Sequence, residues 1–242
     1  ADRLGYIARV EHAVRAVPKG RRQTQPLLSF VIDAGGPLHE RLGAWADDTS
    51  RALLAQAEAH LEQVWLCTPA SQPLLPPPGP RVQHVVLAES RRLGERLRDG
   101  VSASCGGYLC FLEPGDQPDP RFVERHLQSH RFGTLPMLTA SDLRLLDADG
   151  VILHAGIQGT AAGWGVQPAQ VSPFTGLLRD WALAPLPAVV MRRTPLLPAY
   201  FDAALALPPD RMPDRLLGWL LCQYLLQMGG ATRLAENLVD LR

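Results

Sequence analysis

Two acids, Glu113 and Asp116, stand in a turn directly after the apolar run of residues 108–112. Glycines precede this run and a Pro/Gly/Asp cluster ends it, a pattern typical of a buried central strand in an α/β sheet. Ligands of such sheets bind beyond the carboxyl ends of the strands, and carboxylate oxygens are the ligands that hard divalent cations prefer. The spacing therefore predicts a cation site at Glu113 and Asp116. The alternative is that both acids serve only as turn and helix-cap residues.

Strands that alternate with helices must position these acids. Such an alternation implies right-handed crossovers and a largely parallel, doubly wound sheet. An Asp-Gly pair between apolar runs also predicts a hairpin over residues 143–153. The long irregular segment 156–176 is either a substrate loop or a plain excursion of the chain. We expect strands at residues 27–32, 64–67, 82–87, 108–112, 136–142 and 188–193, helices at 38–61, 91–101, 122–130 and from 214, and a strand or turn at 231–242.

Composition excludes several classes of protein. Lys+Arg and Asp+Glu both number 24 in 242 residues, so nothing in the net charge favours nucleic acid or an acidic polymer. The four cysteines form no CxxC pair, which suits reduced thiols in the cytoplasm. His126 and His130 share one helix face, but no acid completes a zinc motif, and a solvated or packing role is favoured over a metal site. No apolar run is long enough to span a bilayer.

The run of residues 108–120 resembles the "GxYxxFLDxDDxxxP" segment of family-2 glycosyltransferases, whose aspartates hold Mg²⁺ or Mn²⁺ against the diphosphate of a sugar nucleotide. Glu113 replaces the first aspartate and Gly115 the last one of the DxD motif, whereas Asp116 is retained. Further segments of the chain resemble the same family in order, so that the resemblance covers residues 27–242. It implies a GT-A type fold for residues 27–242, preceded by a helical extension and linker over residues 1–26.

The resemblance also implies roles for residues outside the acidic turn. The family's uridine-contacting aspartate falls at Thr68 or Pro69. Asp33 lies close to the same pocket, with a plain turn residue as the alternative. Arg192 and Arg193 match a region that faces the donor phosphates, although surface or structural ion pairs are an alternative for either. Asp214 is the surviving acid of the family's ED pair and is expected to be the general base, with a helix cap as the alternative.

The expected function is an inverting, divalent-metal-dependent transfer of a sugar from a nucleotide-diphosphate donor to a hydroxyl of a glycan or other acceptor, in bacterial polysaccharide synthesis. The expected location is the cytoplasm, free or peripheral at the inner membrane. The main alternative is a non-catalytic glycosyltransferase-like module for binding or assembly within a larger protein. A nucleotide-dependent oxidoreductase is disfavoured, because no GxGxxG follows the first strand.

Overall fold

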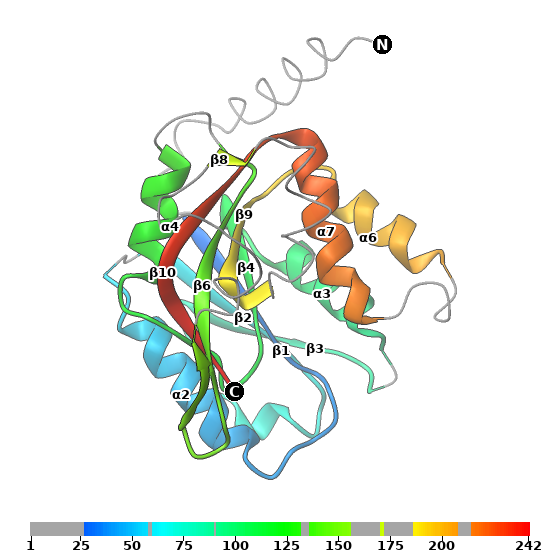
Figure 1. The fold of residues 1–242 in the computed structure, drawn as a ribbon. Coiled ribbons are helices and arrows are strands. Elements are labelled where there is room, and N and C mark those ends of the chain that lie inside the picture. Colours follow the sequence, from blue (N-terminus) through cyan, green and yellow to red (C-terminus); the bar gives the residue numbers. More distant parts are fainter. Residues whose placement is uncertain are drawn as a thin grey trace.

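The computed structural model describes residues 27–57, 60–89, 91–131, 136–155, 170–171, 186–207 and 214–242. The helix predicted within residues 1–26 and most of the irregular segment 156–176 lie outside these ranges. One curled, ten-stranded sheet forms the centre of the part that is described (Figure 1). Its main path runs β3-β2-β1-β4-β9-β6-β10-β5, with β7 paired to β6 and β8 to β10. The strands are β1 (Leu28–Ala34), β2 (Leu61–Cys67), β3 (Val82–Val86), β4 (Tyr108–Leu112), β5 (Gln117–Pro118), β6 (Leu138–Leu146), β7 (Ile152–Ala155), β8 (Gln170–Val171), β9 (Val189–Arg192) and β10 (Ala231–Leu241).

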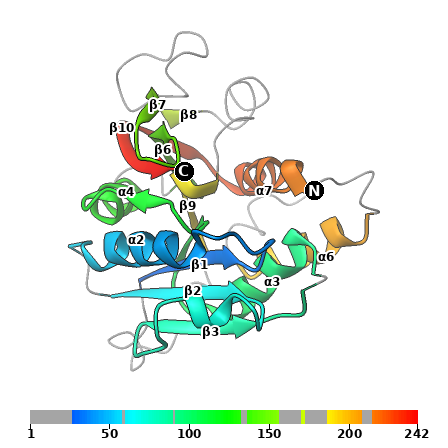
Figure 2. The same ribbon diagram turned by 90° about the horizontal axis from the view of Figure 1, so that it is seen from below.

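Helices cover both faces of this sheet, and each layer closes its own apolar core (Figure 2). Core residues of α3, α6 and α7 pack on one face, and those of α2 and α4 pack on the other. The layers are built from α2 (Leu42–Leu54), α3 (Leu93–Ala103), α4 (Phe122–Arg131), α6 (Leu197–Leu205) and α7 (Asp214–Met228). None of the described helices is long and apolar enough to cross a membrane.

Alternation along the central strands decides which layer each side chain faces. Val31 of β1 and Phe111 of β4 belong to the core under α3, whereas Ile32 and Leu112 belong to the core under α2 and α4. Because side chains on a strand alternate with a period of two, Asp33 and Glu113 continue the row that faces α3.

Most of the predicted elements are confirmed. The hairpin forms between β6 and β7, and its turn is closed by the Gly150 N–H bonded to the Asp147 carbonyl. The helix predicted over residues 38–61 is shorter and spans Leu42–Leu54. Strands β1 to β4 are parallel, and β6 is parallel to β10, but β9 lies antiparallel between β4 and β6.

The two histidines of α4 are core residues, so of the solvated and packing roles that the sequence left open the structure shows packing. His126 and His130 are 0% and 1% exposed. His126 Nδ1 lies 2.7 Å and His130 Nε2 3.2 Å from the hydroxyl oxygen of Thr139 in β6. Burial lowers the pKa of His126 well below its usual value and that of His130 to about 4, so both rings are neutral at pH 7.

Candidate functional site

The carboxyl ends of β1 and β4 bring Asp33 and Glu113 to one edge of the sheet. The two strands are parallel with Ile32 opposite Leu112, so the acids follow at the same level. Asp33 is held by Arg96 of α3 through two bonds: Nε donates to Oδ1 at 2.8 Å, and an Nη atom donates to Oδ2 at 2.7 Å. The Gly35 N–H also donates to Asp33 Oδ1 at 3.1 Å. Asp33 is therefore a fixed, paired carboxylate.

Glu113 differs from Asp33 because its carboxylate accepts no hydrogen bond and forms no ion pair within the described residues. The residue is exposed at the sheet edge. Partial desolvation raises the pKa of Glu113, the nearby Asp33 raises it further, and Arg96 opposes the shift. Of the described acids of this edge, Glu113 is thus the one whose oxygens are available to a ligand.

Asp116 is turned away from that ligand-facing position. It is 4% exposed, and its Oδ2 accepts the Glu113 N–H at 2.7 Å. Thr49 of α2 braces the same turn, donating to the Asp116 carbonyl and accepting the Gly115 N–H. Burial raises the pKa of Asp116 well above its usual value, with Glu113 adding to the shift and the backbone bond opposing it. Asp116 therefore shapes the acidic turn, and the predicted convergence of both carboxylates on an open cation site is not found.

Thr68 follows β2 at the same edge, but its polar groups are used within its own turn. Its backbone N–H donates to Ser71 Oγ at 2.9 Å, and its Oγ1 accepts the Ser71 N–H at 3.2 Å. The residue is 6% exposed. The structure thus places Thr68 at the carboxyl edge of the sheet, with a hydroxyl that is already bonded.

Arg192 and Arg193 lie at the opposite edge of the sheet. Tyr108, the first residue of β4, pairs with Arg192, because β9 runs antiparallel to β4. Glu113 follows the other end of β4, roughly 17 Å further along the strand. Arg193 donates to the carbonyls of Gly106, Val101 and Ser104 at 2.9, 2.9 and 2.6 Å. The structure therefore does not bring these arginines to the predicted donor phosphates, and Arg193 caps the carboxyl end of α3 instead.

Asp214 is the first residue of α7, and its side chain lies outside what the structure describes. The position of its helix is nevertheless defined. A Cβ atom on Gly94, in the first turn of α3, would lie 3.5 Å from Leu217 Cδ2. The starts of α3 and α7 are therefore neighbours (Figure 1). The start of α3 also carries Arg96, the partner of Asp33.

Whether a divalent cation can bind at this edge depends on how the side chains of Glu113 and Asp116 are oriented. Within the described ranges, no three or more His, Cys, Asp or Glu side chains are gathered as a metal site. Mg²⁺ is commonly held by one or two carboxylates together with substrate phosphates and water. Glu113 fits that arrangement as a single protein ligand. Asp116 does not fit it, because its carboxylate is buried and bonded to the Glu113 N–H.

Arg96 is the member of this cluster that the sequence prediction missed. Its side chain is 14% exposed and also donates to the Arg91 carbonyl at 2.8 Å. A signal was present in the sequence: a helix that follows a strand starts at the carboxyl edge of a parallel sheet, and α3 starts with an arginine-rich turn. The sequence could not show that Arg96 pairs with Asp33, because the two residues lie 63 positions apart in the chain.

The fold is similar to solved structures of TarS from S. aureus, a GT-A type glycosyltransferase. The TarS 1–349 structure in complex with UDP-GlcNAc has a TM-score of 0.55 at 11% identity, over 88% of this chain and 57% of that chain. The complex with UDP has a TM-score of 0.53 at 10% identity, over 88% and 59%. Neither a protein-family model nor a curated protein sequence matches the chain.

These similarities show a GT-A type fold: a mostly parallel, curled central sheet flanked by helices. The chain spans about 60% of the length of the TarS 1–349 structures and 36% of that of the longer TarS chain. In this fold the described cluster of Asp33, Arg96 and Glu113 occupies the carboxyl edge of the sheet, the edge at which open α/β sheets bind ligands.

Proposed function

We propose that residues 27–242 form a glycosyltransferase domain that binds a nucleotide-diphosphate sugar at the carboxyl edge of its sheet and transfers the sugar to an acceptor hydroxyl. The observation that carries the proposal is the cluster of Asp33, Arg96 and Glu113 at that edge of a GT-A type fold. The TarS structures with UDP and UDP-GlcNAc support a uridine nucleotide as the first donor to test.

Each side chain has a distinct proposed task. Asp33 holds Arg96 in place, so that the guanidinium presents a fixed positive charge beside the loop of Gly35 and Gly36. Glu113 would hold Mg²⁺ or Mn²⁺ together with the donor diphosphate. Such an ion, when bound, stabilises the negative charge of the departing diphosphate. The Asp116 carboxylate accepts the Glu113 N–H and so stabilises the turn that carries Glu113.

Donor binding tests the proposal directly. Isothermal titration with UDP and Mn²⁺ should give binding by the wild type and at least a tenfold higher Kd for Glu113→Gln. Asp149→Asn is the matched control, because Asp149 is an acid with an 81% exposed side chain in a different turn. If UDP, GDP and dTDP sugars all fail to bind the wild type with and without Mn²⁺, the proposed function is wrong.

Asp214 is proposed as the general base of an inverting transfer. The amino terminus of α7 favours an ionised carboxylate at its first residue. Removal of a general base should lower the transfer rate by roughly 10²–10⁴ with donor binding retained. Asp214→Asn keeps much of the ability to cap the helix, so a variant with normal turnover would show that Asp214 is only a cap, worth about 1 kcal/mol of stability.

The donor pocket is expected to select weakly among nucleotide bases. The Thr68 hydroxyl is bonded to Ser71, and the Asp33 carboxylate is bonded to Arg96. Strong discrimination requires buried polar groups that only the correct ligand satisfies. Uridine, guanosine and thymidine diphosphates should therefore bind with Kd values within about tenfold of one another.

A non-catalytic binding or assembly module is the second candidate. It is favoured by the internal use of predicted site residues: Asp116 in its turn, Thr68 in its turn and Arg193 at the end of α3. Such a module would show neither nucleotide binding nor transfer, so the titration above separates the two candidates. A cytoplasmic location and a role in bacterial polysaccharide synthesis belong to the first candidate and stay proposals.

A further inference from the structure

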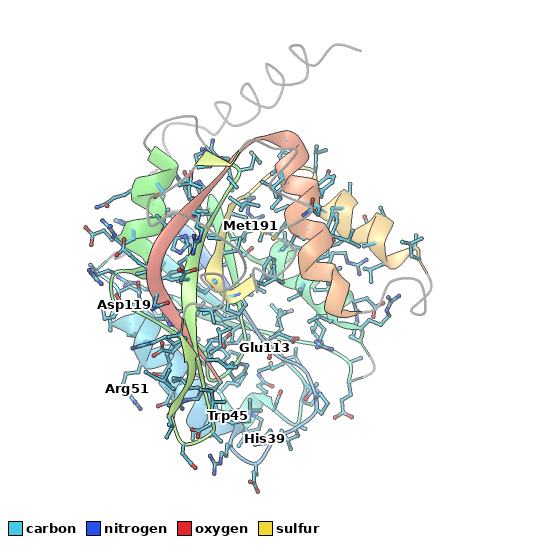
Figure 3. The ribbon with its side chains drawn as sticks, in the orientation of Figure 1. His39, Trp45, Arg51, Glu113, Asp119 and Met191 are labelled. Atoms are coloured by element: carbon cyan, nitrogen blue, oxygen red, sulfur yellow. The ribbon has the colours of Figure 1, made fainter. Side chains whose placement is uncertain are left out.

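A groove of about 330 Å³ lies on the α2 side of the protein, between α2, the segment of β5 and the start of α4, and the strands β6 and β10. Arg51 of α2 and Asp119 after β5 come from two of its walls (Figure 3). Every residue that lines the groove lies within the described ranges. None of the predicted donor, metal or catalytic residues lines it.

Two side-chain amides in the groove have no partner. Gln117 of β5 and Asn237 of β10 both line it, and neither amide forms a hydrogen bond within the described part of the chain. Asn237 stands at an irregularity, since the register between β10 and β6 shifts on both sides of it. Such irregularities re-aim a side chain and are frequent beside binding sites. An amide both donates and accepts hydrogen bonds, as a hydroxyl group does.

The three aspartates and two arginines that line the groove are all held in ion pairs, that of Asp119 with Arg121 outside the groove. Arg144 donates to both oxygens of Asp240 at 2.6 Å. Asp48 accepts bonds from Arg51 at 3.1 Å and from Arg242 at 2.7 Å. An ionic ligand would meet both signs of charge at once, and an apolar ligand would meet few large apolar side chains. Closely spaced donors and acceptors whose charges are already paired suit a neutral ligand that carries many hydroxyl groups.

The groove reaches the acidic turn of the candidate donor site. Arg242 pairs with Asp48, and its Cβ would lie 3.5 Å from a Cβ atom placed on Gly115. Gln117 follows Asp116 directly in the chain. The groove therefore lies beside the turn that carries Glu113, on the α2 side of the sheet.

We propose that this groove is a carbohydrate subsite that binds the neutral, non-reacting part of a glycan acceptor. The assignment as an acceptor subsite rests on the proposed glycosyltransferase function, whereas the binding of neutral saccharides can be measured without it. The side-chain amides of Gln117 and Asn237 form hydrogen bonds with those saccharide hydroxyl groups that the ion-paired residues of the groove do not contact.

The test is an NMR titration of the ¹⁵N-labelled protein with the neutral tetrasaccharides cellotetraose, maltotetraose and chitotetraose. At least one should shift groove resonances with a millimolar Kd, and the double variant Gln117→Ala/Asn237→Ala should raise that Kd at least tenfold. Gln72→Ala is the control, because Gln72 is an exposed glutamine outside the groove. Glucose 6-phosphate should bind no more tightly than glucose if the ligand is neutral.

The outcomes separate the two proposals. If none of the neutral saccharides shifts groove resonances, if the double variant binds as the wild type does, or if the phosphorylated sugar is preferred, the carbohydrate subsite is wrong. The double variant should bind UDP with Mn²⁺ as the wild type does. Saccharide binding without any nucleotide binding would refute the glycosyltransferase function and leave the groove as a glycan-binding site.

Discussion

Two arginines show how differently one residue type is used in this protein. Arg96 makes a two-bond pair with Asp33 at the carboxyl edge of the sheet, at distances of 2.7 and 2.8 Å. Arg193 lies at the amino end of β4 and satisfies backbone carbonyls where α3 ends. Burial lowers the pKa of Arg193, yet the guanidinium stays charged because arginine ordinarily titrates above pH 12. We therefore assign Arg96 to the ligand edge and Arg193 to stability.

Replacing Arg193 tests this assignment at the level of the residue. Arg193→Gln should lower the free energy of unfolding by about 2 kcal/mol, because hydrogen bonds from a charged donor are lost and carbonyls of Val101 and Ser104 lose their partner. Urea denaturation measures the change, and Arg121→Gln is the exposed control, expected within about 0.5 kcal/mol of the wild type. UDP affinity should be unchanged. If Arg193→Gln had normal stability but no longer bound UDP, Arg193 would contact the donor phosphates after all.

At the level of the element, α3 carries Arg96 to the site because it packs very closely on the sheet. Gly100 provides the close approach: a Cβ atom there would lie 2.5 Å from Val31 Cγ1 and 3.0 Å from Leu66 Cδ2. Both contacts are with buried core residues, which have little room to move. The lack of a side chain at Gly100 thus determines how deep α3 sits and where its first turn presents Arg96.

Gly100→Ala should therefore destabilise the protein by about 1–3 kcal/mol, because overpacking outweighs the better helix propensity of alanine. Gly43→Ala is the matched control in α2, since its nearest contact would be 3.6 Å, an ordinary distance. That variant should be neutral or gain up to about 1 kcal/mol. Thermal and urea unfolding measure both. Equal stability of the two variants would contradict the packing argument, and a shifted α3 should also weaken UDP binding in Gly100→Ala.

At the level of the whole molecule, buried titratable groups make stability depend on pH. The pKa of His130 in the folded protein is about 4, and that of His126 is well below 6.5, chiefly because burial disfavours the charged rings. Between about pH 6.5 and pH 4 the unfolded chain therefore binds more protons than the folded chain, and stability falls as pH falls. Asp116 has the opposite sign: its raised pKa favours the folded state in acid and opposes part of this loss.

The free energy of unfolding should therefore decrease from pH 7 towards pH 4, by up to about 1.4 kcal/mol per pH unit for each histidine. Urea denaturation at several pH values measures the slope. His130→Gln should reduce the slope in this window, and the exposed His39→Gln serves as its control. A slope that His130→Gln leaves unchanged would show that His130 is not a neutral core residue whose protonation opposes folding.

The amino-acid sequence by itself determined the order and type of the elements around the site. Apolar periodicity and turn residues are local signals, so β1, β4, the hairpin of β6 and β7, and the start of α7 at Asp214 were predictable. The same local pattern placed Glu113 at the carboxyl end of a central strand, and the structure confirms that position.

Only the tertiary structure decided which of those residues meet. The antiparallel insertion of β9 between β4 and β6 moved Arg192 and Arg193 to the far edge of the sheet. The packing of the acidic turn against Thr49 of α2 turned Asp116 inward. Strand neighbours and buried orientations depend on contacts between segments far apart in the chain, as Asp33 and Arg96 are, and no local pattern of residues records those contacts.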